Sequence, residues 1–241
     1  MLLLWELLTD GTHTISTKFL ASPVGIAEEF VTLLRTGYAG TPLWDHFAAS
    51  LGRTLSGYLL SAVVAIPVGL WMGLNPYVRA VLSPLFNLMR PVPAIALIPV
   101  MVLWFGIGET SKIFVIFLAS FLYVVLNTSS GVATIPEGLI RAAINLGANR
   151  AQLFRYVIFP AAMPSIMTGL KTGLAVSWAV VVAAELIAAQ KGLGYMIEDA
   201  ATFYRINDVY VGVILIGVIG LFMGASLEAI ERRVMHWAGK S

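Results

Sequence analysis

Five long apolar stretches decide what this chain can fold into. Each holds about 20 or more mainly apolar residues, the length that an α-helix needs to cross the hydrocarbon core of a bilayer. Backbone groups find no water in lipid, so such a segment must bond its own backbone as a helix. The stretches cover about 51–74, 81–106, 113–133, 163–189 and 209–229. The sequence therefore predicts an all-α membrane protein with a five-helix core.

The composition agrees with a multi-pass membrane protein. Of the 241 residues, 59% are hydrophobic and 12% are charged, which is about half the charged share of a soluble domain. The net charge is only +2 and no basic run occurs, so nucleic acid is not an expected partner. Cysteine is absent, which excludes disulfides and thiolate metal sites.

No catalytic or metal-binding motif is present. The sequence lacks a glycine-rich phosphate loop, so the chain is not expected to bind and hydrolyse ATP by itself. Its histidines, His13, His46 and His236, lie in predicted loops or a tail without a second ligand at metal spacing. We therefore predict no catalytic residue, no metal site and no cofactor in this chain. A membrane enzyme stays an alternative for which the sequence offers almost no residues.

The chain divides into three parts. Residues 1–50 hold an opening MLLLWELL, too short for a span and typical of the end of a span whose start is missing or reduced. They also hold an amphipathic piece, Pro23 to Leu34, which we place outside the membrane. Residues 51–230 form the transmembrane core, interrupted by a polar loop at 134–162, and residues 231–241 form a basic tail. We expect a five-helix core with a short or partial N-terminal element.

Small residues recur every four positions along the first span. Such a stripe lets a second helix approach closely in lipid, where packing drives helix association. Packing within the chain and contact with another subunit both fit the pattern. The stripe consists of Gly57, Ser61, Ala65, Gly69 and Gly73, and a shorter motif of this kind, Gly220 and Gly224, lies in the last span.

Prolines interrupt the second span. Arg90, Pro91 and Pro93 fall within it, and a proline removes a helical hydrogen bond whose freed carbonyl must face protein or water. We therefore predict a kink. Arg90 lies about ten residues into the span as bounded above, or is an interfacial anchor if the helix begins near Pro91.

Polar groups inside the spans mark a candidate path through the membrane. A charge at the bilayer centre is costly and usually faces a protein interior or water. Lys171 either extends its stem to the cytoplasmic surface or lines a path. Glu185 either pairs with Lys191 at the interface, or lines or gates a path. The candidate path residues are Arg90, Pro91, Pro93, Asn127, Lys171 and Glu185.

The longest polar stretch, Thr134 to Pro164, predicts a short helix, a tight turn and a second helix. Thr134 and Glu137 have the spacing of a capping box that starts the first helix. Glu137 precedes Arg141 by four residues, the favourable order for an ion pair. We expect Gly147 to end this helix.

The second helix of the stretch begins with a further capping signal. Asn149 is followed by Gln152 three residues later, and we expect the helix to end before Pro160. Both helices carry an apolar face and are too short to be stable alone in water. Resting on lipid and docking into a protein groove both fit. The faces comprise Leu139, Ile140, Ala143 and Ile144 on the first helix, and Leu153, Phe154, Val157 and Ile158 on the second.

The distribution of lysine and arginine sets the orientation. Positive charges are enriched in the short cytoplasmic segments of membrane proteins. One side has the denser set and we place it, with the polar loop and the C-terminus, in the cytoplasm. That side holds Arg79, Arg141, Arg150, Arg155, Arg232, Arg233 and Lys240, and the other holds Lys18, Arg35, Arg53, Lys112, Lys191 and Arg205.

The polar loop resembles the cytoplasmic EAA loop of the membrane subunits of ABC importers, whose pattern is E-A-A-x3-G-x9-I-x-L-P. The spacing is kept throughout. The chief departure is Arg141, where the family usually has glutamate, and Glu137 is the candidate to take part of that role. The matching positions are Arg141, Ala142, Ala143, Gly147, Val157, Phe159 and Pro160.

Permeases of the nitrate, sulfonate, taurine and bicarbonate importers are similar to this chain from about Pro23 to Gly220. The stretches that carry the similarity are HFAASLGRTLSGYLLSAVVAIPVGLWMG, PVPAIALIPVMVLWFGIGETSKI, LNTSSGV and VVAAELIAAQKGLGYMIEDA. The resemblance implies a type I ABC importer permease fold in the bacterial plasma membrane, with a cytoplasmic C-terminus.

The resemblance also implies partners. Two permease copies, expected to be a homodimer, would form the path. An external binding protein would deliver a small anion, such as nitrate, bicarbonate, taurine, another sulfonate or an organic acid. ATP and Mg would be bound by partner ATPase subunits. The alternatives within transport are a permease for another small metabolite, an exporter and an ATPase-independent channel. A scaffold is an alternative from another class, which would leave the charges inside the spans unexplained.

In this family a short helix of the EAA loop sits in a groove of each ATPase subunit. The resemblance therefore implies that the loop couples ATP hydrolysis to transport. The candidate coupling residues are Glu137, Arg141, Ala142, Ala143, Gly147, Asn149, Arg150, Phe154 and Pro160.

Overall fold

The computed structural model describes residues 5–6 and 20–235, and the regular structure of these residues is helical. This confirms the all-α prediction. The predicted partial span at the N-terminus and the end of the basic tail fall largely outside the described residues. The elements are α2 (Pro23–Thr36), α3 (Leu43–Leu74), α4 (Pro76–Met89), η2 (Ala94–Leu97), α5 (Ile98–Phe105), α6 (Glu109–Ala133), α7 (Glu137–Asn145), α8 (Arg150–Leu153), η3 (Phe154–Ile158), α9 (Phe159–Ala188), α10 (Leu193–Thr202) and α11 (Ile206–Val234).

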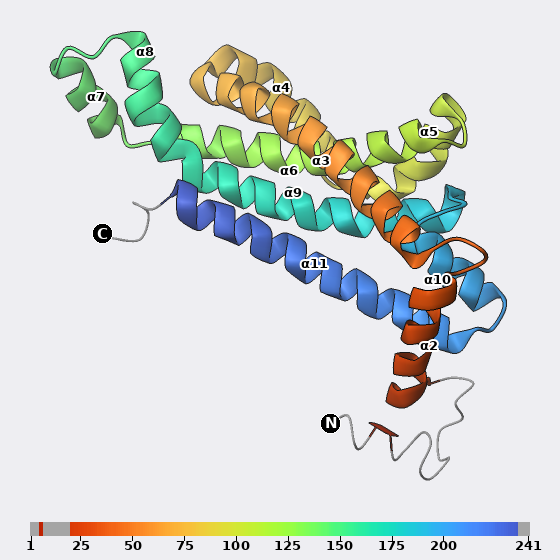
Figure 1. Ribbon diagram of the computed structural model, residues 1–241. Coiled ribbons are helices and arrows are strands. Elements are labelled where there is room, and N and C mark those ends of the chain that lie inside the picture. The colour runs from red at the N-terminus through yellow and green to blue at the C-terminus, as the bar shows by residue number, and fades with distance from the viewer. Residues whose placement is uncertain (1–4, 7–19, 236–241) are drawn as a thin grey trace.

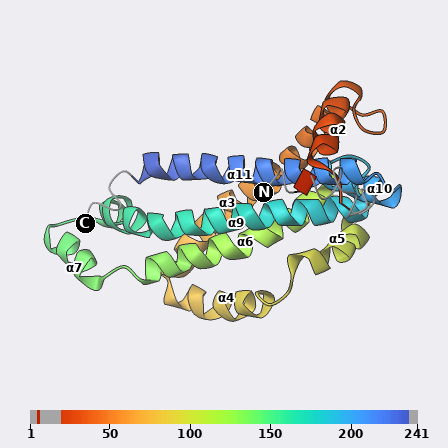
Figure 2. The same ribbon diagram turned by 90° about the horizontal axis from the view of Figure 1, so that it is seen from below.

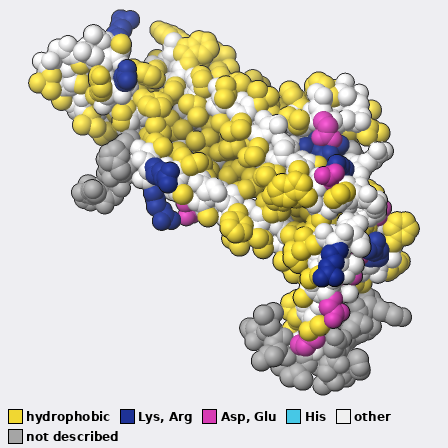
Figure 3. Space-filling view, in the orientation of Figure 1, with side chains coloured by type: hydrophobic (Ala, Val, Ile, Leu, Met, Phe, Trp, Pro, Cys, Tyr) yellow, Lys and Arg dark blue, Asp and Glu magenta, His cyan; other side chains and the backbone are white. Residues whose placement is uncertain are grey.

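Helices α3, α6, α9 and α11 are long and apolar enough to cross a membrane, and α4 with η2 and α5 has the length and composition of one further, bent span or of a re-entrant loop. α6 packs between α3 and α9, and α11 runs beside α9 (Figure 1, Figure 2). Hydrophobic side chains cover the middle of the face seen in Figure 3, and charged side chains gather toward its two ends. This distribution is the one expected for a bundle that crosses a bilayer.

The small-residue stripe of α3 packs against α6 of the same chain. A Cβ added to Gly57 would lie 2.7 Å from an isoleucine side chain of α6, and one added to Gly69 would lie 2.6 Å from a threonine side chain there. Ser61 and Ala65, between them, are fully buried. Packing within the chain is therefore the correct interpretation of this stripe.

The motif in the last span makes a different contact. A Cβ on Gly220 would lie 3.1 Å from the indole nitrogen of Trp178 in α9, whereas one on Gly224 would meet no described atom within 4 Å. Within the described chain, only Gly220 of this pair therefore allows a close contact, and the group that approaches it is the Trp178 side chain rather than a helix backbone.

The second span is broken more sharply than a kink. α4 ends at Met89, and the axis turns by 87° before η2 and α5. Pro91 and Pro93 have no N–H to donate, so the helix cannot continue through them. Arg90 is the residue at the break. Arg90 lies within the span when α4, η2 and α5 are taken as one bent span, and its depth in the membrane stays a prediction.

Two spans begin earlier than hydropathy predicted. α3 starts at Leu43 rather than near 51, and α6 starts at Glu109 rather than near 113. Their first turns contain polar residues such as His46 and Lys112, which are only 1% and 5% exposed. Hydropathy treats these residues as solvated, but the Nδ1 of His46 contacts Gly192 and the Nζ of Lys112 donates to Glu109.

The first helix of the polar loop lacks the predicted capping box. Thr134 ends α6, and its Oγ1 donates to the carbonyl of Ser130 at 3.1 Å. α7 begins at Glu137 after Pro136, without a side-chain cap. Its end agrees with the prediction, because Gly147 has φ +84°, a conformation that glycine adopts without strain.

The second helix of the loop confirms one prediction and overturns another. Asn149 and Gln152 form both bonds of a capping box, each 2.9 Å long. The helix does not end before Pro160, however, but runs from Arg150 into α9. The π turn η3 explains this continuity. The Phe159 N–H bonds to a carbonyl five residues back, and the proline, which has no N–H, falls in the first turn after the register changes.

Candidate functional site

The polar loop formed by α7, α8 and the turn between them stands beyond one end of the bundle, at the same end as the last turns of α11 (Figure 1). α7 contributes no buried residue. The predicted ion pair between Glu137 and Arg141 forms on its exposed surface. Of its apolar face, Ile140 packs on the base of the loop, whereas Leu139 and Ile144 are 52% and 54% exposed. Large apolar side chains thus remain uncovered here within the described chain.

The structure brings the predicted coupling residues together at this end. Most of them are exposed, and Ala143 and Pro160 are half-buried. Pro160 lies at the base of the loop, where α9 begins. The grouping is compatible with one docking surface, and the coupling role stays a prediction.

A cavity of about 670 Å³ lies between the broken second span, α6 and α9. Four predicted path residues line it together: Arg90, Pro91, Pro93 and Asn127. The Asn127 Nδ2 donates to the carbonyl of Tyr123 at 2.8 Å. The remaining wall is mainly leucine, alanine, valine and phenylalanine.

Lys171 lies apart from this cavity. It lines a smaller space of about 330 Å³ between α9 and α11, and its Nζ pairs with Glu231 near the end of α11. Both side chains are partly exposed. The contact ties the C-terminal part of α11 to α9, and the path role of Lys171 stays a prediction.

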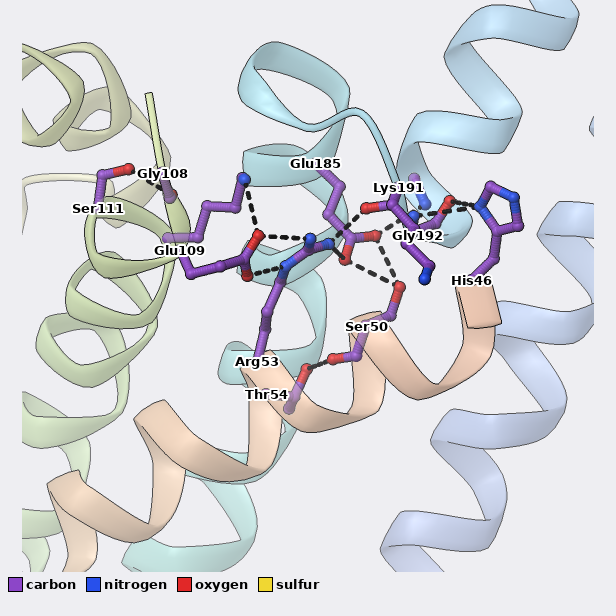
Figure 4. Close-up of polar contacts among 12 residues, drawn as sticks. His46, Ser50, Arg53, Thr54, Gly108, Glu109, Ser111, Glu185, Lys191 and Gly192 are labelled. Atoms are coloured by element: carbon purple, nitrogen blue, oxygen red, sulfur yellow. Dashed lines mark hydrogen bonds and ion pairs between the residues drawn. The ribbon is translucent and has the colours of Figure 1, made fainter. Parts of the chain in front are cut away.

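Glu185 is at the opposite end of α9 and is only 1% exposed. Its carboxylate accepts from Ser50 Oγ at 2.7 Å, from Arg53 Nη1 at 2.6 Å and from the Gly194 N–H at 3.0 Å (Figure 4). The predicted pairing with Lys191 is wrong, because the Nζ of that lysine binds Asp45 at 3.0 Å. Glu185 lines neither cavity.

Arg53 is the centre of a polar cluster in which α3, α6 and α9 meet, at the end of the bundle away from α7 (Figure 1). We call it the outer cluster, and it comprises His46, Ser50, Arg53, Glu109, Lys112, Glu185 and Gly192. The Nε and Nη2 of Arg53 donate to the two oxygens of Glu109, at 2.5 and 2.7 Å. Its Nη1 donates to Glu185 and to the carbonyl of Lys191, both at 2.6 Å. Lys112 adds a second cation 3.3 Å from Glu109. The buried charges are thus balanced, which is the condition under which a protein interior tolerates them.

A glycine closes the outer cluster from the loop before α10. Gly192 has φ +135°, and a Cβ there would lie 2.4 Å from the carboxylate of Glu185. The Nδ1 of His46 lies 3.0 Å from the carbonyl and 3.2 Å from the amide nitrogen of the same glycine. Any larger residue at this position would displace the carboxylate.

A second polar contact ties the segment after α2 to α10. The Oη of Tyr38 donates to Asp199 at 2.7 Å, and the guanidinium of Arg205 lies 4.8 Å from the centre of its ring. Burial, followed by the bond to Asp199, raises the pKa of Tyr38 above its ordinary value. The hydroxyl therefore stays a donor at neutral pH.

Sequence reasoning missed most of the outer cluster. Ser50, His46 and Glu109 carried no functional prediction, and Arg53 was used only for orientation. A signal was present, because Arg53 and Glu185 are opposite charges inside predicted spans, and such charges usually pair with one another.

Comparison with known proteins gives a family match. Residues 65–236 match the family described as binding-protein-dependent transport system inner membrane component. The taurine transport system permease protein TauC of Escherichia coli (strain K12) is 44% identical over 94% of this chain and 82% of its own length. The putative aliphatic sulfonates transport permease protein SsuC of the same organism is 34% identical, over 97% of this chain and 87% of its own.

More distant relatives agree with this match. The nitrate import permease protein NrtB of Synechocystis is 31% identical over 98% of this chain and 86% of its own length. A chain of the MetNI methionine ABC transporter, solved in an inward-facing conformation, superposes with a TM-score of 0.67 at 20% identity. The superposition covers 86% of this chain and 98% of that one. At this identity the likeness shows the fold alone.

Proposed function

Because the chain belongs to the family of binding-protein-dependent transport system inner membrane components, and is thus an ABC importer permease, we propose that its substrate is a small anion. Taurine, aliphatic sulfonates and nitrate are named for three of its relatives. Each carries a compact group whose negative oxygens accept hydrogen bonds. Bicarbonate and organic acids have the same chemistry.

The observation that carries the coupling part of the proposal is the exposed face of α7. This helix has no buried residue, yet Leu139 and Ile144 are more than half exposed, and Leu146 beside it is 89% exposed. An isolated nine-residue helix is not stable in water by itself. A hydrophobic groove on an ATPase subunit would cover these side chains, which is a common way for proteins to bind an amphipathic helix.

The family membership and the exposed face of α7 support the following partners. The ATPase subunits bind ATP and Mg, and this chain is their non-catalytic membrane partner. A second copy of the permease completes the path as a homodimer, and an external binding protein delivers the anion. The polar loop and the C-terminus face the cytoplasm, which is supported by exposed arginines near that end, such as Arg150, Arg155 and Arg233.

Reconstitution tests the proposal. The permease is co-expressed with the ATPase subunits of its system, purified, and placed in liposomes with the binding protein outside and ATP inside. We expect uptake of taurine or nitrate that requires ATP and the binding protein together. Uptake that persists without ATP would instead identify a channel, and purification without any ATPase subunit would overturn the coupling assignment.

A further inference from the structure

The large cavity lies at the middle of the membrane-spanning helices. Its α6 wall runs from Leu118 to Asn127, within a helix that extends from Glu109 to Ala133. Its α9 wall runs from Thr172 to Val180, again in the central turns of the helix. Because both helices are long enough to cross a bilayer, the cavity falls near half of the membrane depth. Substrate sites of transporters built from broken helices lie at this depth.

A single arginine supplies the charge of this cavity. Among the described residues that line it, Arg90 alone is ionised at neutral pH. Its side chain forms no hydrogen bond and no ion pair within the described chain. The carbonyl end of α4 favours a cation at this position, but that contribution is smaller than the cost of a lone charge in hydrocarbon. An unpaired guanidinium here therefore implies water or an anion beside it.

The other polar groups on the wall add donors. Tyr123 is 41% exposed and its hydroxyl has no partner among the described residues. One of the two amide hydrogens of Asn127 bonds to a backbone carbonyl, which leaves the second free. No carboxylate of the described chain lines the cavity. A surface with a free guanidinium and free donors, and without a competing carboxylate, is complementary to an anion.

We propose that Arg90 is the anion-recognition residue of the translocation path, and that a nitrate, sulfonate or carboxylate group binds its guanidinium in this cavity. The planar guanidinium can donate two parallel hydrogen bonds to two oxygens of one such group. The apolar remainder of the wall keeps the site weak, as a path requires, because an ion that binds too tightly does not leave. The proposal rests on the proposed function and names the site that the anion uses.

The absence of cysteine from the sequence allows a direct test. Arg90→Cys gives the permease a single thiol, and the complex is assembled with ATPase subunits free of reactive cysteine. Uptake of taurine and nitrate is measured before and after two methanethiosulfonate reagents of similar size. One attaches an aminoethyl group and restores a positive charge, and the other attaches a negatively charged sulfonatoethyl group.

We expect Arg90→Cys to reduce uptake at least tenfold. The aminoethyl reagent should raise the remaining uptake of this variant at least threefold, and the sulfonatoethyl reagent should not raise it. Leu88→Cys is the control, because Leu88 lies two residues before Arg90 in the last turn of α4, is 74% exposed and does not line the cavity. Its uptake should stay within twofold of the parent protein.

The outcomes separate the two proposals. If the parent protein imports neither anion, the proposed function and the role of Arg90 fall together. If the parent imports and Arg90→Cys imports equally well, or if both reagents restore uptake alike, only the role of Arg90 is overturned. Loss of the permease dimer in Arg90→Cys, seen by light scattering, would assign the arginine to a subunit contact instead.

Discussion

Two arginines in the membrane-spanning part of this chain have opposite surroundings. Arg53 is 6% exposed and donates four hydrogen bonds, to two carboxylates and a backbone carbonyl. Arg90 is exposed in a cavity and its side chain has no partner in the described chain. The same residue type thus serves as a structural tie in the outer cluster and as an available charge on the cavity wall. The difference lies in the partners that the fold brings to each.

The largest effect should come from removing the paired arginine. Arg53→Met leaves the buried carboxylate of Glu185 without its cation, and breaking a buried pair in this way costs about 3–5 kcal/mol. We expect a large fall in the thermal unfolding temperature of the detergent-solubilised permease. Arg90→Met is the matched control and should leave stability within about 0.5 kcal/mol, because it removes no contact. Equal destabilisation by both variants would mean that Arg90 stabilises the fold as much as Arg53 does.

A second test addresses the fit of the outer cluster. Gly192→Ala places a Cβ 2.4 Å from the carboxylate of Glu185, at φ +135°, and should destabilise the permease by about 2 kcal/mol through strain and displacement. Gly106→Ala is the control, since its φ is +77° but its Cβ would meet nothing within 4 Å. Its cost should be about 1 kcal/mol, from the backbone alone. Thermal unfolding of the two variants measures the difference, and equal losses would mean that the cluster tolerates a methyl group.

The contrast also explains what the sequence could predict. Local spacing identified the break at Pro91 and Pro93 and the capping box at Asn149, because each depends on residues within a few positions. The outer cluster could not be derived in this way. Arg53 is 56 residues from Glu109 and 132 from Glu185, and no periodicity connects them.

Two errors came from applying local rules where packing decides. Pro160 was expected to end a helix, but a π turn shifts the register so that its missing N–H falls in a first turn. His46 and Lys112 were placed outside the spans because of their polarity, although the Nδ1 of His46 and the Nζ of Lys112 bond within the protein. The contact of His46 joins it to Gly192, 146 residues away, and hydropathy cannot reveal such a contact.

The end of the molecule that carries α7 is the opposite extreme from the outer cluster, because its large apolar side chains are uncovered within the described chain. Gly147→Val forces a branched side chain into φ +84° and should displace the turn between α7 and α8. We expect at least a tenfold loss of uptake per ATP hydrolysed, with the permease still present in the membrane. Gly138→Val, in open space without a positive φ, is the control. Normal uptake and normal substrate-stimulated ATP hydrolysis in Gly147→Val would contradict the coupling role.

The smallest effect on stability should come from the exposed ion pair of α7, and it tests Glu137 as a substitute for the usual glutamate of the loop. Glu137→Arg puts two like charges four residues apart, which costs only about 0.5 kcal/mol in a surface helix. Glu228→Arg does the same to the exposed pair with Arg232 on α11. If Glu137 contacts the ATPase, its variant alone should reduce the ATPase co-purified with the permease, by about threefold or more. Equal recovery of ATPase from both variants would show that Glu137 pairs with Arg141 but does not contact the ATPase.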